Sequence, residues 1–371
     1  MEHYESASAA ERAILDSAGK THTPVSGSIE LLPLCNMNCD MCYVRLDAKA
    51  VARLGGLRTM EEWLDIARQM RDAGTLFLLL TGGEPLLYPD FKQLYLQLRK
   101  LGMLISINTN GTLIDEEWAA FFGKYKPRRI NITLYGADDD TYARLCHYPG
   151  GFEKVTRAVR LLREQKVEVR MNCSIARENA ADLDHVHEIG EALGVPVRAD
   201  TYMTPATRER DMPYAMQARL LPEDAGRCQI RAMKREMGPA LFARFAQKSI
   251  WEEAHILPDE GPAKMHCRAG KCSYTINWQG EMRPCVVMSA PAANVLEVGF
   301  DAAWRHIVAE TEKIELASAC NACSLRTICR TCAACALYET GRYDGVPDYM
   351  CRYARASMEA LHEEAEKASK E

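Results

Sequence analysis

Three cysteines, Cys35, Cys39 and Cys42, are spaced C-x3-C-x2-C on one short segment that follows an apolar run. Three thiolates at this spacing can hold three corners of a 4Fe-4S cluster and leave its fourth iron open for another ligand. A zinc site usually needs four ligands, so a structural zinc here requires a remote cysteine to complete it. The spacing therefore favours an iron-sulfur cluster whose open iron can bind a substrate or cofactor.

A second motif, TGGEPLL, directly follows the apolar run at residues 76–80. Its paired glycines, Gly82 and Gly83, allow the backbone to approach a ligand closely. Beside them, Glu84 precedes Pro85, and a carboxylate in this position can accept a hydrogen bond from an ammonium group. The alternative interpretation is a plain turn before a helix.

Polar residues also occur where further apolar segments end. Asn108 and Asn110 end one segment, and Arg170 and Asn172 lie in another. These side chains can contact a bound cofactor, although the Asn-Gly pair at 110–111 also fits an ordinary turn and Arg170 also fits a salt bridge.

Nine more cysteines gather near the C-terminus. They are Cys267, Cys272, Cys285, Cys320, Cys323, Cys329, Cys332, Cys335 and Cys351. Nine thiols can supply two four-ligand sites with one to spare. Two zinc ribbons are a serious alternative to two iron-sulfur clusters, because C-x2-C pairs are common zinc ligands. The remaining Cys146, Cys173 and Cys228 stand alone and are expected to be buried thiols.

Composition narrows the function classes. The 371 residues are 47% hydrophobic and carry 46 Lys plus Arg against 51 Asp plus Glu, for a net charge of −5. Such a chain forms sizeable cores and offers no broad positive field for nucleic acid. It contains neither an apolar run long enough to span a membrane nor a secretory signal, so we expect a cytoplasmic protein without a membrane partner. Because cytoplasmic thiols are kept reduced, its 15 cysteines indicate metal ligation more than disulfides.

The elements that must position these residues alternate along the chain. Apolar segments typical of strands occur at residues 28–34, 75–82, 104–110, 129–135, 168–175 and 195–203. Amphipathic segments typical of helices occur at residues 60–74, 91–102, 151–165 and 181–194. Six strand-helix units predict an α/β fold around a parallel sheet, either a partial barrel or an open doubly wound sheet. Both architectures place a ligand at the carboxyl ends of the strands.

We predict five regions along the chain. They are an N-terminal extension (1–27), the strand-helix region (28–204), a helical bridge (205–262), a cysteine-rich region (263–355) and a C-terminal helix (356–371).

The first two motifs together resemble the radical S-adenosylmethionine (SAM) superfamily, over residues 28–204. The resemblance implies a partial (β/α)6 TIM-like barrel. It also implies a cluster on Cys35, Cys39 and Cys42 whose open iron chelates SAM, so that one-electron cleavage yields a 5′-deoxyadenosyl radical. Gly82, Gly83, Glu84 and Pro85 match the GGEP motif that contacts the SAM amino group, while Asn108, Asn110, Asn172 and Arg170 are candidates for further SAM contacts. One departure is Met41, where the family usually has an aromatic residue before the third cysteine.

The C-terminal region resembles the SPASM extension of that superfamily, a small Cys-rich α+β domain with two auxiliary 4Fe-4S clusters. This resemblance assigns Cys267, Cys272 and Cys285 to the first auxiliary cluster. It assigns Cys320, Cys323, Cys329 and Cys351 to the second. The fourth ligand of the first cluster falls at Ala333, so Cys332 or Cys335 must take that place or the cluster has an open iron. We expect three 4Fe-4S clusters in all.

Many SPASM enzymes act on a peptide or protein, and the resemblance implies a maturase that crosslinks, epimerises or oxidises a ribosomally made peptide. Its partners would be that peptide and an electron donor such as flavodoxin or ferredoxin. A separate leader-binding protein could also take part, because the first strand begins near residue 28 and leaves little room for a leader-binding domain.

Three alternatives stay open. One is an anaerobic sulfatase maturase, although Val286 stands where those enzymes carry an Asp. The second is an enzyme that modifies a small molecule or tetrapyrrole. The third is an iron-sulfur or zinc binding module that is not an enzyme. No catalytic acid or base can be assigned from the sequence.

Overall fold

A parallel six-stranded sheet forms the centre of the protein, in a computed structural model that describes residues 9–204, 218–257 and 263–368. Each strand is followed by one or more helices, so the fold is the α/β barrel-like arrangement that was predicted. The six strands are β1 (Ser26–Glu30), β2 (Phe77–Thr81), β3 (Leu104–Thr109), β4 (Arg129–Thr133), β5 (Val169–Ser174) and β6 (Val197–Asp200).

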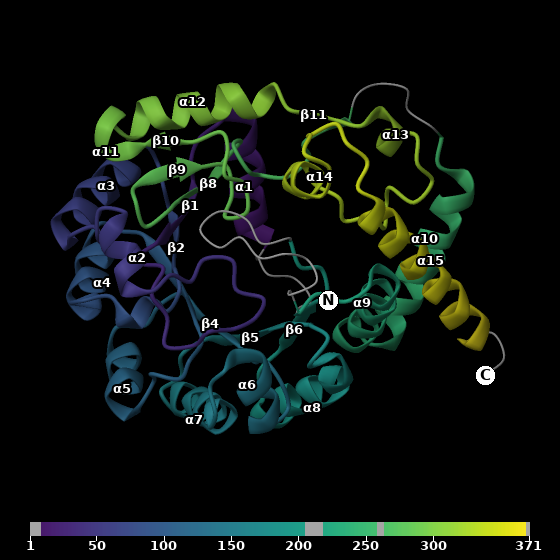
Figure 1. Cartoon of the computed structure of the whole chain (residues 1–371), viewed down its shortest axis with the longest axis horizontal. Helices are drawn as coiled ribbons and strands as arrows, with labels where there is room; N and C mark the ends of the chain where they lie inside the picture. The colour runs from purple at the N-terminus through teal and green to yellow at the C-terminus, as the bar shows by residue number, and fades with distance from the viewer. Residues whose placement is uncertain (1–8, 205–217, 258–262, 369–371) are drawn as a thin grey trace.

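The sheet forms an open arc that is longer than the barrel alone (Figure 1). Its nine strands run in the order β10-β9-β8-β1-β2-β3-β4-β5-β6. The added strands are β8 (Ser273–Ile276), β9 (Glu281–Arg283) and β10 (Ala293–Asn294). β8 pairs with β1 in parallel, with Ser26 opposite Ser273. The start of the cysteine-rich region is therefore built onto the barrel sheet, a long-range pairing that local sequence patterns do not reveal.

Helices cover the outer side of the arc (Figure 1). They are α2 (Ala48–Arg53), α3 (Met60–Asp72), α4 (Phe91–Lys100), α5 (Glu116–Lys124), α6 (Asp139–Cys146), α7 (Gly151–Glu164) and α8 (Leu183–Leu193), with short 3-10 turns η1 (Pro85–Leu87) and η2 (Ala180–Asp182). α3 begins with a capping box, in which the Thr59 side chain accepts from the Glu62 amide and Glu62 accepts from the Thr59 amide. Such reciprocal bonds satisfy amides that have no partner within the helix.

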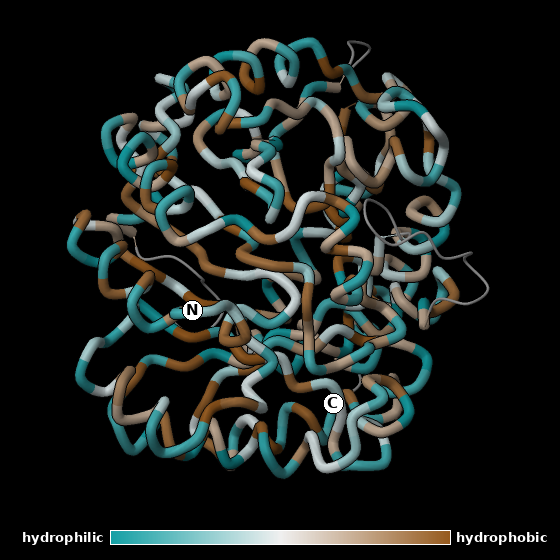
Figure 2. The backbone as a smooth tube through the Cα atoms, turned by 60° about the vertical axis from the view of Figure 1, so that its left-hand side comes forward, coloured by the Kyte–Doolittle hydropathy of each residue, from teal (hydrophilic) through white to brown (hydrophobic). Residues whose placement is uncertain are grey.

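The core lies between these helices and the strands. Alternate strand residues such as Ile107, Ile130 and Ile132 are fully buried against helix side chains such as Trp63 and Phe122. The opposite strand face carries polar residues, for example Asn108 and Asn131, whose side chains hydrogen bond at 2.7 Å. Figure 2 shows the matching alternation of hydrophilic and hydrophobic stretches along the outer helices. The barrel interior is thus polar, as a ligand-binding lumen requires.

The predicted strands lie close to the observed ones, but the first is displaced. It was predicted at residues 28–34 and is observed at Ser26–Glu30. Residues 31–34 instead leave the sheet towards the cysteine loop, because Leu32 and Leu34 bond to the loop after β2 rather than to a strand.

Two consecutive helices, α9 (Pro222–Met237) and α10 (Pro239–His255), lie in the predicted bridge at 205–262. Residues 205–217 and 258–262 of that bridge lie outside the described residues. The C-terminal helix α15 (Asp348–Ala368) packs on α9 and starts eight residues before the predicted position. It therefore includes Cys351, which was predicted to lie before the helix.

The remaining elements lie at the N-terminus and in the C-terminal half. They are α1 (Ala9–Thr21) near the N-terminus, and β7 (Ala263–Lys264), α11 (Val295–Val298), α12 (Phe300–Glu312), β11 (Glu315–Leu316), α13 (Ser318–Asn321) and α14 (Ala333–Thr340). Figure 1 shows α13, α14 and α15 beside the open side of the arc. Among the described helices, none has the length and apolar character that crossing a membrane requires.

Candidate functional site

The loop between β1 and α2 carries Cys35, Cys39 and Cys42 at the carboxyl end of β1. Main-chain bonds fix it to the end of α6, since the Asn38 amide donates to the Cys146 carbonyl and the Asp40 amide to the Leu145 carbonyl, both at 3.0 Å. Burial raises the pKa of the Cys35 thiol to about 12, and the nearby charges of Glu84, Cys39 and Cys42 add to the rise. Three thiols whose charges interact in this way suit a cationic metal cluster, which would stabilise their thiolate forms.

The two glycines of the second motif hold this cysteine loop in place. The Gly83 amide donates to the Leu32 carbonyl at 2.7 Å and the Glu84 amide to the Leu34 carbonyl at 2.9 Å. A Cβ at Gly82 would lie 2.4 Å from the Leu32 carbonyl oxygen, and one at Gly83 would lie 2.2 Å from that of Leu34. Both positions therefore need glycine because two backbone segments meet there. This steric requirement is separate from any contact with a ligand.

Glu84 faces the protein rather than open space. Its side chain is fully buried and accepts from the Thr109 hydroxyl at 2.8 Å, the Asn110 amide at 2.8 Å and the Leu86 amide at 3.0 Å. Burial raises the pKa of Glu84 to about 7, against the effect of these donors. The carboxylate joins the loop after β2 to the end of β3. A hydrogen bond from the SAM amino group to Glu84 stays a prediction.

A cavity of about 390 Å³ collects most of the predicted cofactor-binding residues. It lies where the strands end and is lined by all three cysteines of the loop, by Gly82 and Gly83, and by Asn108, Asn110 and Asn172. Asn110 also contacts the loop directly, with its Nδ2 3.7 Å from the Cys35 Sγ. The rule that ligands bind at the carboxyl ends of parallel strands thus brings together motifs up to 137 residues apart in sequence (Cys35 to Asn172).

Three of the predicted cofactor-binding residues do not line this cavity. Glu84 is directed away from it, and Pro85 is buried at the start of η1. Arg170 lies two residues before Asn172 on β5 and lines a separate cavity. A SAM contact by Arg170 therefore stays a prediction that this arrangement does not favour.

Other residues line the cavity that the sequence analysis did not single out. They are Thr81, Thr109, Thr133, Tyr135, Ser174, Tyr202, Met203 and Thr204, besides the loop residues between the cysteines. Most occupy strand ends, so the rule that selected Asn108 and Asn172 could have selected Tyr135 and Tyr202 as well.

Four cysteines of the C-terminal region line a second cavity, of about 270 Å³. They are Cys320, Cys323, Cys329 and Cys351. Burial raises the pKa of Cys320, and the charges of Cys329, Cys351 and Cys323 raise it further. Since α15 begins early, its first turn supplies Cys351 to this group. These are the four residues predicted to hold the second auxiliary cluster, and four thiols around one cavity fit such a group.

The other auxiliary cysteines do not all face one another. Burial raises the pKa of Cys285, and the charges of Cys332 and Cys267 add to this rise, so these three thiols are neighbours. Cys272 points elsewhere, because its Sγ lies 3.4 Å from the Leu15 carbonyl oxygen of α1 and packs with Ala18 and Val25. Ligation by Cys272 stays a prediction that would need this side chain to turn away from α1.

Cys335 is also engaged by another group. It is fully buried, and the Tyr202 hydroxyl lies 3.0 Å from its Sγ. Burial raises the pKa of Cys335 to about 12. Between the two candidates for the fourth ligand of the first auxiliary cluster, the arrangement therefore favours Cys332.

Cys35, Cys39 and Cys42 line one cavity, and Cys320, Cys323, Cys329 and Cys351 line another. Among the described residues, no three His, Cys, Asp or Glu side chains are close enough to hold a single metal ion. The lone cysteines Cys146 and Cys173 are buried, as expected, whereas Cys228 is partly exposed. Cys146 has a further contact, because its hydrogen bond to Cys39 lowers the pKa of Cys39.

Comparison with known proteins agrees with this site. Residues 29–188 match the model that describes the Radical SAM superfamily. The chain is 24% identical over 339 residues to an AdoMet-dependent heme synthase of Methanosarcina barkeri, covering 87% of this chain and 95% of that protein. It is also 24% identical over 268 residues to the antilisterial bacteriocin subtilosin biosynthesis protein AlbA of Bacillus subtilis, covering 71% of this chain and 55% of that protein.

A solved structure shares the fold over nearly the whole chain. SuiB of Streptococcus suis, in a crystal structure bound to S-adenosylmethionine, superposes with a TM-score of 0.64 at 18% identity and covers 91% of this chain and 80% of its own. The likeness extends beyond the barrel, so SuiB shares the arrangement of the barrel and the C-terminal region.

Proposed function

We propose that the chain, whose residues 29–188 match the Radical SAM superfamily, binds SAM in the cavity at the strand ends and modifies a peptide by hydrogen abstraction. The observation that carries this proposal is the single cavity of about 390 Å³ on which Cys35, Cys39, Cys42, Gly82 and Gly83 converge. When bound there, the cluster and SAM would supply the one-electron chemistry that produces the 5′-deoxyadenosyl radical.

The protein's own residues have distinct tasks in this proposal. The three thiolates would hold three irons of the cluster, and the two glycines keep the cysteine loop against the end of β2. Asn108, Asn172 and Ser174 line the opposite side of the cavity and offer hydrogen bonds to SAM or substrate. Tyr135 also lines the cavity, and radical chemistry requires that water be kept from the reacting groups.

A peptide substrate is supported by the shape of the barrel and by the relatives. The sheet does not close, since among the described residues β6 pairs only with β5. The open side can admit an extended chain. AlbA takes part in bacteriocin biosynthesis, and SuiB has been crystallised with its precursor peptide SuiA. An electron donor such as flavodoxin or ferredoxin, and a separate leader-binding protein, belong to the same proposal.

The C-terminal region would hold two auxiliary 4Fe-4S clusters, for a total of three. Cys320, Cys323, Cys329 and Cys351 around one cavity support the second. Cys267, Cys285 and Cys332 support three positions of the first.

A second candidate substrate is a tetrapyrrole, because the match to the heme synthase covers 95% of that protein. The two candidates can be separated directly. Anaerobically reconstituted protein would be reduced with dithionite in the presence of SAM, and 5′-deoxyadenosine would be measured by mass spectrometry. Its formation tests radical SAM activity without any substrate.

The same reactions would then receive either Fe-coproporphyrin III or a short peptide encoded beside the gene. A mass change in the peptide alone supports the peptide proposal, and a mass change in the tetrapyrrole alone replaces it. Absence of 5′-deoxyadenosine in all reactions would reject radical SAM activity itself.

A further inference from the structure

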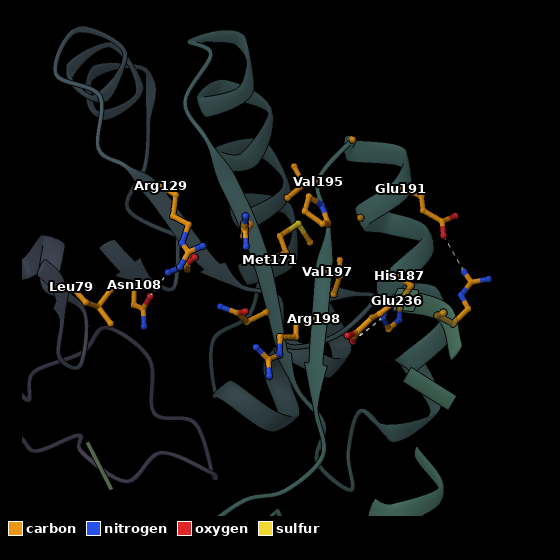
Figure 3. A pocket seen from close by; sticks show the side chains of 17 residues that line it. Leu79, Asn108, Arg129, Met171, His187, Glu191, Val195, Val197, Arg198 and Glu236 are labelled. Atoms are coloured by element: carbon orange, nitrogen blue, oxygen red, sulfur yellow. Dashed lines mark hydrogen bonds and ion pairs between the residues drawn. The ribbon is translucent and has the colours of Figure 1, made fainter. Parts of the chain in front are cut away.

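A second cavity in the barrel, of about 690 Å³, is lined by arginines and amides. Arg129, Arg170 and Arg198 come from the first two residues of β4, β5 and β6, and Asn108, Asn131 and Asn172 line the same cavity. Figure 3 shows Arg129, Arg198 and Asn108 around this space. Cross-strand pairing sets this arrangement, because Arg170 lies opposite Asn131 and Arg198 lies opposite Asn172. Three neighbouring strands therefore present three guanidinium groups to one space.

This cavity adjoins the one assigned to SAM. Asn108 and Asn172 line both of them. Arg170 precedes Asn172 by two residues on the same strand, a distance of about 7 Å along a β-strand. A substrate whose reacting atom lies in the SAM cavity can thus reach the arginines with a group about 7 Å from that atom.

Positive charge exceeds negative charge around the cavity. Four arginines and two glutamates line it. Both glutamates are engaged on the helix side, where Glu236 accepts from the Ala199 amide at 2.7 Å and Glu191 lies 3.6 Å from Arg235. Glu168 lies 3.9 Å from the Arg170 Nε. Arg198 has no ion pair among the described residues and is exposed to the cavity.

Partial burial and the neighbouring arginines make the charge of Arg129 costly. Desolvation and the charges of Arg128 and Arg170 lower the pKa of Arg129 to about 10, while the carboxylates of Glu11 and Glu168 act in the opposite direction. Arg129 stays protonated at neutral pH, since its pKa is still well above 7. A bound anion would relieve the repulsion, and a planar guanidinium group matches a carboxylate through two parallel hydrogen bonds.

We propose that Arg129, Arg170 and Arg198 form a site for a carboxylate of the substrate, which anchors that substrate while its reacting carbon lies in the SAM cavity. This inference rests on the proposed function for its reacting atom, but binding can be measured without turnover. The carboxylate can belong to an acidic peptide residue or to a propionate of a tetrapyrrole, and the two sources are the two arms of the test.

The test measures equilibrium binding to the cluster-loaded protein with SAM present, by anaerobic calorimetry. One arm compares Fe-coproporphyrin III with its tetramethyl ester. The other compares an eight-residue Glu/Ala peptide with its Gln/Ala counterpart. We expect the acid form in one arm to bind, its neutral counterpart to bind far more weakly, and the affinity to fall as salt is raised.

Arg170→Gln and Arg198→Gln should each weaken binding of that acid by about ten- to a hundredfold, the loss expected for one charge-assisted hydrogen-bonded contact. Arg157→Gln is the control, because Arg157 pairs with Glu116 on the outer side of the barrel and should bind as wild type does.

The inference is overturned if neither acid binds, if the neutral forms bind as well as the acids, or if both arginine variants keep wild-type affinity. Circular dichroism of each variant checks that the fold is retained, and a variant that unfolds is replaced by Arg→Lys at the same position, which keeps the charge and should lose less affinity. 5′-Deoxyadenosine formation by the wild-type protein is measured in parallel, so loss of the carboxylate site is distinguished from failure of the proposed radical SAM activity.

Discussion

The Tyr202 hydroxyl lies 3.0 Å from the Cys335 Sγ and 3.3 Å from the Glu339 Oε1. Tyr202 also lines the cavity assigned to SAM, while Cys335 sits three residues after Cys332 in the cysteine-rich region. The contact therefore joins the barrel site to the region proposed to hold the auxiliary clusters. Arg219 bonds to Glu339 and lies against the Tyr349 ring, which fixes the carboxylate beneath Tyr202.

This contact leads to a prediction about iron content. Since Cys335 is buried and bonded to Tyr202, while Cys332 neighbours Cys267 and Cys285, Cys332→Ala should lose about four of about twelve irons and Cys335→Ala should keep them. Iron and zinc would be measured after anaerobic reconstitution. The reverse pattern would make Cys335 the ligand, and about four irons with two zincs in the wild type would favour the zinc-ribbon alternative.

The first cysteine loop can be tested independently of the auxiliary region. Replacing Cys35, Cys39 and Cys42 together with Ala should abolish 5′-deoxyadenosine formation, because no thiolate remains to hold the SAM-binding cluster. Cys320, Cys323, Cys329 and Cys351 are far away in sequence and should keep their iron. If the triple variant still produced 5′-deoxyadenosine, the SAM site would lie elsewhere.

Local sequence patterns were enough to predict the parallel strand-helix units, the cysteine loop and the glycine motif. The choice of a partial barrel over an open doubly wound sheet came from the family resemblance. Strand periodicity located β2 to β6, and the carboxyl-end rule brought Asn108 and Asn172 to the cysteines. Local sequence patterns could not predict the pairing of β8 with β1, since it joins residues more than 240 positions apart. The direction of the Glu84 and Cys272 side chains was also unpredictable, because burial and donors from other segments decide it.

The close approach at Gly83 gives a third prediction. A methyl group there would lie 2.2 Å from the Leu34 carbonyl oxygen, so Gly83→Ala must push the cysteine loop away from β2. Overpacking of this kind costs about 1 to 3 kcal/mol. The variant should unfold at lower denaturant and take up less iron.

Gly19→Ala is the matched control for Gly83→Ala. It lies within α1, and a Cβ there meets only the Cys272 Sγ at 3.9 Å. Because Ala favours a helix over Gly, this control should leave stability unchanged or slightly raised. Equal denaturation midpoints for Gly83→Ala and wild type would show that the glycine motif does not brace the loop.

The last prediction concerns the pH dependence that Glu84 confers. Its pKa is raised by burial to about 7 from an ordinary value of 4.5. The folded protein therefore binds more protons than the unfolded chain between these values, and the free energy of unfolding should fall as pH rises from about 4.5 to 7. A shift of this size corresponds to about 3 kcal/mol. Below pH 4.5 the group adds no further dependence, because it is protonated in both states.

Glu84→Gln removes the titrating group while keeping an oxygen that can accept from Asn110. Its unfolding free energy should change less with pH than that of the wild type. As pH rises from 5 to 8, the variant should therefore become more stable relative to the wild type. Glu164→Gln, at an exposed position on α7, is the control for the same change of side chain. Denaturant titrations followed by circular dichroism at several pH values measure the difference in unfolding free energy between each variant and the wild type. If it stayed constant for Glu84→Gln, Glu84 would titrate alike in the folded and unfolded chains, and its carboxylate would have to be hydrated or paired with a cation instead of held by Thr109 and Asn110.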